Sequence, residues 1–351
     1  MLYNPAYPGL LPTLLIMSKR RLSRRQLQRI TDQQEERKSR VDGGVDQSED
    51  ILGPEQGGVV ICNYGREVDV EPDTSEPPKQ LVRCRQRANL PPIVAGDRVI
   101  WQQESEAKGV LVAVEPRNSV LERPGFNGIL RAVAANIDIV FIVIAPIPEP
   151  FANLVDRYLV AVENQGLKPV ILLNKNDLRE SFSQKIDNLL SIYEKVGYET
   201  LRVSALQAES LSDINKLLGN QTAVFVGQSG VGKSSLINTL FPEAEAVIGE
   251  LSATRDKGTH TTTAAKLFHL PDGGHVIDSA GIREFSLGHI DRTDLINGFI
   301  DLKPYAQRCK FRDCSHQHEP ACALLEAVAA GEVSDQRMAN YNLILNSLEK
   351  A

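Results

Sequence analysis

One nine-residue segment constrains the fold of this 351-residue chain more than any other feature. It reads G-x-x-x-x-G-K-S followed by a further serine; it follows the apolar run TAVFV, and its two serines begin the amphipathic stretch SSLINTLF. A strand, a glycine-rich turn and a helix in this order form a P-loop, whose backbone N–H groups surround phosphate oxygens. We therefore expect an α/β domain with a phosphate site formed by Gly227, Gln228, Ser229, Gly230, Val231, Gly232, Lys233, Ser234 and Ser235. Lys233 is expected to reach the β- and γ-phosphates, and the Ser234 hydroxyl to bind Mg²⁺.

A second pattern selects the base. Directly after the strand-like run PVILL, where α/β sheets bind ligands, stands an N-K-x-D motif formed by Asn174, Lys175, Asn176 and Asp177. The Asp177 carboxylate can accept hydrogen bonds from guanine N1–H and the exocyclic amine, a donor pair that adenine lacks. Asn174 is expected to contact the other edge of the base, and the Lys175 stem to cover its face. Ser204 and Ala205 follow another strand-like run, and the Ala205 N–H suits guanine O6. Together these residues favour GTP over ATP.

A third motif is placed to sense the γ-phosphate. Asp278 and Gly281 form D-x-x-G after the run GHVI, so Asp278 is expected to hold Mg²⁺ through water. Residues 258–263 read GTHTTT, which suits a mobile loop that supplies a threonine hydroxyl to the metal. Ile282 follows the D-x-x-G motif and cannot orient water, so slow intrinsic hydrolysis is expected. The nearest candidate for a catalytic group is His260, although a histidine in such a loop can equally be exposed and without a role.

The order of these motifs is unusual. In ordinary GTPases the P-loop comes first, whereas here N-K-x-D and the S-A-L segment, Ser204-Ala205-Leu206, precede it. Apolar runs alternate with helical patterns throughout residues 125–290, which predicts an α/β P-loop G domain with a largely parallel sheet. The domain therefore looks circularly permuted, with its γ-phosphate-sensing segment leading directly into the C-terminal region.

Three of the five cysteines lie within fourteen residues near the C-terminus. The spacing C-x4-C-x-H-x5-C predicts a closed tetrahedral zinc site formed by Cys309, Cys314, His316 and Cys322. By spacing alone His318 is a competing ligand. The remaining residues of 295–351 read as a helical zinc-binding domain. Cys62 and Cys84 lie in strand-like segments and are expected in a core.

Residues 58–120 alternate with period two in five strand-length runs, namely GVVICNYG, EVDVE, QLVRCR, DRVIWQQ and KGVLVAVE. Glycine, proline, asparagine and aspartate separate the runs, which predicts a small β-barrel of the OB type. Such barrels often bind oligonucleotides, but any other small barrel would show the same pattern.

Residues 1–57 read as a basic, largely disordered extension. Nine Lys and Arg residues lie between Met17 and Arg40 against three acids, which fits either a solvated tail or an arm that neutralises phosphates. The apolar run within residues 1–16 has no basic residue before it, unlike a signal peptide, and reads as a dispensable extension or an upstream-start artefact. No apolar run reaches about 18 residues, so we expect no membrane span and a cytoplasmic protein. The net charge of −6 excludes a uniformly basic nucleic-acid binder and leaves only local patches.

A β-barrel, a permuted G domain and the C-x4-C-x-H-x5-C segment, in this order, resemble the bacterial RsgA (YjeQ) family of small ribosomal subunit biogenesis GTPases. The resemblance covers about residues 17–351 and is most specific in the motif order, the G-x-H-T-T-T loop and the Cys/His spacing. It implies GTP or GDP with Mg²⁺ at the P-loop and N-K-x-D residues. It also implies one structural zinc ion held by His316 rather than His318, and it places any catalytic role in the loop on His260. Ala280 departs from the D-x-P-G of many members.

The resemblance further implies late maturation of the 30S subunit, with GTP hydrolysis stimulated by the subunit and release of other 30S assembly factors. The barrel and the segment Lys19–Arg29 would then contact 16S rRNA, and we expect a monomer. One alternative is a nucleotide-gated RNA-binding module whose hydrolysis is incidental. Another is a permuted GTPase of the large subunit, against which the barrel and zinc arrangement argues. An ATPase is the weakest interpretation.

Overall fold

The structure is a computed structural model that describes residues 52–73, 80–125, 129–181, 183–241, 265–271, 273–278 and 290–348. Several expectations from the sequence lie outside these ranges: the N-terminal extension with its basic segment, the loop with His260, and residues 279–289 with Ala280, Gly281 and Ile282. Within the described ranges, every helix is too short or too polar to cross a lipid bilayer.

Five strands close into the predicted N-terminal barrel. They are β1 (Glu55–Asn63), β2 (Glu67–Pro72), β3 (Val82–Arg85), β4 (Arg98–Ser105) and β5 (Lys108–Val114). β1 pairs with both β2 and β4, β2 with β3, and β5 with both β3 and β4, so the pairing returns to its start. Alternate side chains fill the interior, including Val60, Val99, Trp101 and Leu111, and Cys62 and Cys84 are buried as expected.

The central sheet has the strand order β10-β9-β8-β11-β13-β12. Its strands are β8 (Ile139–Ile144), β9 (Lys168–Leu173), β10 (Glu199–Arg202), β11 (Thr222–Val226), β12 (Lys266–His269) and β13 (His275–Asp278). The first five in the order are parallel, whereas β12 runs antiparallel to β13. All six residues of β8 are buried, as expected for a central strand covered on both faces.

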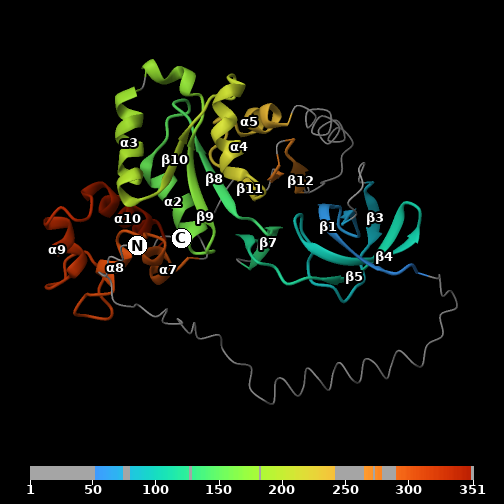
Figure 1. Cartoon of the computed structure of the whole chain (residues 1–351). Helices are drawn as coiled ribbons and strands as arrows, with labels where there is room; N and C mark the ends of the chain where they lie inside the picture. Colours follow the sequence, from blue (N-terminus) through green and yellow to red (C-terminus); the bar gives the residue numbers. More distant parts are fainter. Residues whose placement is uncertain are drawn as a thin grey trace, which may run out of the picture. The chain divides into compact units, whose positions relative to one another are not determined.

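Helices cover both faces of this sheet (Figure 1). On one face, α2 (Ala152–Glu163) and α3 (Ser183–Val196) pack on Val140 and Ile142 of β8. On the other face, α4 (Ser212–Leu218) and α5 (Lys233–Leu240) pack on residues that include Phe141. This alternation follows from the period-two geometry of the strand. Short 3₁₀ helices, η1 (Asn176–Ser181) and η2 (Ala208–Leu211), follow β9 and β10.

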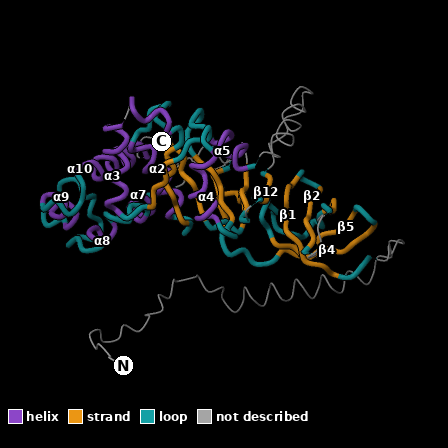
Figure 2. The backbone as a smooth tube through the Cα atoms, turned by 45° about the horizontal axis from the view of Figure 1, so that its top comes forward, coloured by secondary structure: helices purple, strands orange, loops and turns teal. Residues whose placement is uncertain are grey.

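Two features of the region between barrel and central sheet were not predicted. β1 of the barrel pairs with β12 through Cys62 and Lys266, so that the strands of the two parts form one sheet (Figure 2). A separate hairpin, β6 (Val120–Pro124) and β7 (Leu130–Ala135), lies between β5 and β8 in the chain.

The C-terminal region is helical, as predicted, and is anchored on the G domain. It contains α7 (Arg292–Asn297), α8 (Lys303–Ala306), α9 (Ala323–Ala329) and α10 (Asp335–Leu348). Arg337 of α10 is 1% exposed and pairs with the fully buried Asp156 of α2 and with Asp301. Asn340 donates a hydrogen bond to Asp156 at 2.5 Å. These contacts satisfy the buried carboxylate and fix α10 against α2.

Candidate functional site

The P-loop turns at the end of a buried strand. β11 leads into Gly227, and α5 begins at Lys233. Gly227, Gly230 and Gly232 have φ angles of 140°, 84° and 92°, a region in which L side chains are strained. A Cβ at Gly227 would lie 2.3 Å from the Val143 carbonyl oxygen. The local chain therefore requires glycine in order to turn this close to β8.

Lys233 supplies the positive charge of the loop. Its Nζ donates to the carbonyl oxygens of Gly227 at 2.6 Å and Gln228 at 2.7 Å, and the residue is 9% exposed. Ser234 and Ser235 are exposed beside it, in the first turn of α5. An ammonium group and hydroxyl groups at a helix N-terminus after a glycine-rich turn suit phosphate oxygens.

Asn174 connects three loops that are distant in the sequence. Its Nδ2 donates to the Val231 carbonyl oxygen at 2.9 Å, and its Oδ1 accepts from the Ala205 N–H at 3.1 Å. The side chain is 1% exposed. The sequence pattern predicted that the Asn174 side chain and the Ala205 N–H contact the base. In the structure the Asn174 amide instead binds the Ala205 N–H and the Val231 carbonyl of the P-loop. The structure thus gives Asn174 a positioning role that the sequence analysis missed.

Asp177 lies at the same edge of the sheet, in the first turn of η1, and is exposed. Its Oδ1 accepts from the Ser204 hydroxyl at 2.5 Å. Lys175 Nζ donates to the carbonyl oxygens of Ile147 at 2.8 Å and Gly230 at 2.7 Å. The Lys175 stem is therefore held between the P-loop and the loop that follows β8. A carboxylate with solvent access beside it suits a ligand with paired N–H donors.

Asp278 ends β13, which is the parallel neighbour of β11. The carboxyl ends of neighbouring parallel strands meet at one edge of a sheet, so Asp278 lies at the edge that carries the P-loop. Gly281 and His260, which were predicted to act near the γ-phosphate together with Asp278, lie outside the described residues.

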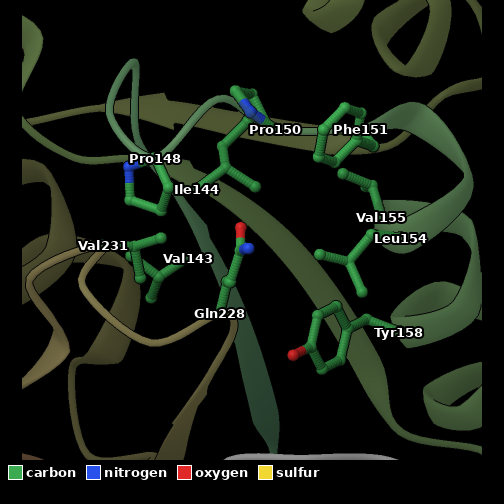
Figure 3. A pocket seen from close by; sticks show the side chains of 10 residues that line it. All are labelled: Val143, Ile144, Pro148, Pro150, Phe151, Leu154, Val155, Tyr158, Gln228 and Val231. Carbon is green, nitrogen blue, oxygen red and sulfur yellow. The ribbon is translucent and has the colours of Figure 1, made fainter.

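An apolar pocket lies next to the P-loop, between the end of β8 and α2. Figure 3 shows the Gln228 side chain between Pro148 on one side and Phe151, Leu154 and Tyr158 on the other. The lining of the pocket is almost entirely hydrocarbon, which does not suit a phosphate.

The four predicted metal ligands meet at one point. The ligand atoms of Cys309, Cys314, His316 and Cys322 all lie within 4.8 Å of one another. The sulfurs of Cys309 and Cys322 are 3.7 Å apart, and each lies 3.5 Å from His316 Nδ1. Zinc bonds of about 2.3 Å to sulfur and 2.0–2.1 Å to nitrogen give about 3.8 and 3.6 Å between tetrahedral ligands. The observed spacing therefore fits a tetrahedral zinc ion.

The surroundings of this cluster explain the choice of histidine. His316 is buried and its Nδ1 lies 3.5 Å from the sulfurs of Cys309 and Cys322, whereas His318 is exposed. Glu319 accepts from the Ser315 N–H at 2.7 Å, and hydrogen bonds from Ser315 hold the pKa of this carboxyl well below its usual range. Burial raises the pKa of the Cys314 thiol to about 12, and a bound cation would stabilise its thiolate.

Comparison with known proteins identifies close relatives. The family model described as RsgA GTPase matches residues 114–288. The protein named small ribosomal subunit biogenesis GTPase RsgA from Azotobacter vinelandii (strain DJ / ATCC BAA-1303) is 50% identical over 338 residues, covering 95% of this chain and 98% of that protein. The protein of the same name from Ectopseudomonas mendocina (strain ymp) is 49% identical over 338 residues, with the same coverage.

Solved structures show the same arrangement. YloQ, described as a circularly permuted GTPase, superimposes with a TM-score of 0.67 at 28% identity, covering 88% of this chain and 98% of that one. YjeQ from Thermotoga maritima superimposes with a TM-score of 0.69 at 28% identity, covering 85% of this chain and all of the other. The circular permutation expected from the motif order is therefore confirmed at the level of the fold.

Proposed function

The chain belongs to the RsgA family of GTPases, and we propose that it hydrolyses GTP to GDP and phosphate during late maturation of the small ribosomal subunit. One observation above all supports this proposal. The Asn174 side chain joins the P-loop to the N-K-x-D and S-A-L segments. A phosphate loop and a base-selecting carboxylate are thereby brought to one edge of the sheet, which is what a guanine nucleotide requires.

Within this site we assign each residue a role. The P-loop, Gly227 to Ser235, surrounds the phosphates, and Lys233 moves from its carbonyl partners to the β- and γ-phosphates. Asp177 reads the guanine N1–H and amine, while Lys175 covers one face of the base. A bound Mg²⁺ neutralises charge on the phosphates, and Ser234 and Asp278 are the residues that would hold it, Asp278 through water.

Hydrolysis is proposed to be slow until a partner binds. Ile282 follows the D-x-x-G motif and has no group that orients water. His260 is the proposed catalytic residue, acting once the partner is bound.

The zinc ion is proposed to be structural. Four protein ligands leave no open position for a substrate, and Cys309, Cys314, His316 and Cys322 provide them. The ion would join the segment before α9 to the segment after α8.

The proposed partner is the 30S subunit, because the relatives carry the name small ribosomal subunit biogenesis GTPase. The barrel and the segment Lys19–Arg29 are proposed to contact 16S rRNA. We further propose a cytoplasmic monomer that assists the release of other assembly factors.

Co-sedimentation tests the partner directly. Zinc-loaded chain is mixed with 30S or 50S subunits in the presence of a non-hydrolysable GTP analogue or GDP, and the Lys233→Ala variant serves as the control. We expect the chain to pellet with 30S subunits and the analogue, and much less with GDP or with 50S subunits. Equal binding to both subunits would contradict the assignment. Tight 30S binding without any stimulated hydrolysis would favour a nucleotide-gated RNA-binding module instead.

A further inference from the structure

Outside the predicted nucleotide and zinc sites, two histidines face each other across the hairpin formed by β12 and β13. His269 and His275 are direct cross-strand partners in the antiparallel ladder. Their Nδ1 atoms lie 2.9 Å apart, and their rings meet at 86°. The His269 side chain is 42% exposed, so solvent reaches the pair.

A buried carboxylate fixes the tautomer of His269. Glu71 of β2 lies with Oε2 2.8 Å from His269 Nε2, and its side chain is only 9% exposed. An ionised carboxylate only accepts hydrogen bonds, so Nε2 carries the ring proton and Nδ1 of the neutral ring has a lone pair. A histidine that binds a metal typically donates its other N–H to a carboxylate in this way.

We propose that His269 and His275 form a second metal site, in which their Nδ1 atoms bind one divalent transition-metal ion and water completes the coordination. Metal–nitrogen bonds of about 2.0–2.1 Å combined with the 2.9 Å separation give an angle of about 90° at the ion. Ligands of a tetrahedral zinc ion would need to be about 3.3 Å apart. The geometry therefore suits square-planar or octahedral ions such as Cu²⁺ and Ni²⁺ better than Zn²⁺.

An ion at this position would link two strands, one of which is also hydrogen-bonded to the barrel. It would join β12 to β13, the strand that ends at Asp278. Glu71 belongs to the barrel, and β12 already pairs with β1 through Lys266 and Cys62. The ion would therefore stiffen the junction between the barrel and the central sheet. A direct N–H···N hydrogen bond between the two rings would also give a distance of 2.9 Å, so the test must separate a bound ion from this simpler contact.

Nickel is a suitable probe because it binds imidazole and accepts an angle of 90°. Untagged, zinc-loaded chain is dialysed against Ni²⁺, and both metals are then counted by elemental analysis. We expect one Ni²⁺ per chain with the zinc retained, and a rise in melting temperature on addition of Ni²⁺.

Three variants make the test specific. His275→Ala should abolish both the bound nickel and the rise in melting temperature, whereas His318→Ala, which removes an exposed histidine beside the cysteine cluster, should change neither. Glu71→Ala should weaken nickel binding by about tenfold or more, because no acceptor then orients His269. Three results would each overturn the proposal: no nickel on the wild-type chain, nickel bound only with equal loss of zinc, or equal nickel binding by His275→Ala.

Discussion

Replacing Asn174 with alanine should loosen the nucleotide site while leaving the sheet intact. The wild-type side chain makes two hydrogen bonds, one to the Val231 carbonyl and one from the Ala205 N–H. Each bond contributes about 0.5–1.5 kcal/mol net, and a buried group left without a partner costs about 1–3 kcal/mol. A loss of about 2–3 kcal/mol of the free energy that holds the loops in position corresponds to about a 30- to 150-fold rise in the Kd for GDP.

Titration of a fluorescent GDP analogue measures this change directly. Asn176→Ala is a matched control, because Asn176 is in the same motif but its Oδ1 has no hydrogen-bond partner in the structure. The control should bind GDP within about threefold of wild type. If Asn174→Ala also binds within threefold, the side chain does not position the loops and our reasoning about this site is wrong.

Three further changes test other parts of the structure. Asp177→Asn should reduce the preference for GTP over ATP by at least about tenfold in competition binding, because an amide cannot accept both guanine donors. An unaltered preference would show that Asp177 does not select the base. Arg337→Met leaves the buried Asp156 without its cation, so the free energy of unfolding measured in urea should fall by about 3–5 kcal/mol. A fall below about 1 kcal/mol would show that the pair does not anchor α10. Cys314→Ser should reduce zinc from one ion per chain to less than half by elemental analysis, and full retention would exclude this cysteine as a ligand.

Each element that was predicted from the sequence is marked by a pattern within its own short stretch of residues. The five barrel strands alternate with period two between turn residues, and the P-loop has a strand before it and a helix after it. The four predicted metal ligands lie within fourteen residues, so their spacing in the sequence already places them close together. The fold class and the family could therefore be read from the chain.

Apart from the local β6–β7 hairpin, the features that were missed depend on partners far away in the sequence. β12 is a run of only four residues, and it is a strand because β13 and β1 lie on either side of it. Asn174 reaches Val231, 57 residues away, so no local pattern shows that its amide is used inside the protein. Glu71 and His269 are separated by 198 residues and meet only because the barrel pairs with the central sheet.

Release of phosphate from GTP, by the chain alone and with 30S or 50S subunits at fixed salt, tests the proposed function most directly. We expect slow basal turnover that rises strongly with 30S subunits only, and loss of both activities in Lys233→Ala. Turnover that neither subunit stimulates would leave the nucleotide site in place but contradict a GTPase that acts on the small ribosomal subunit.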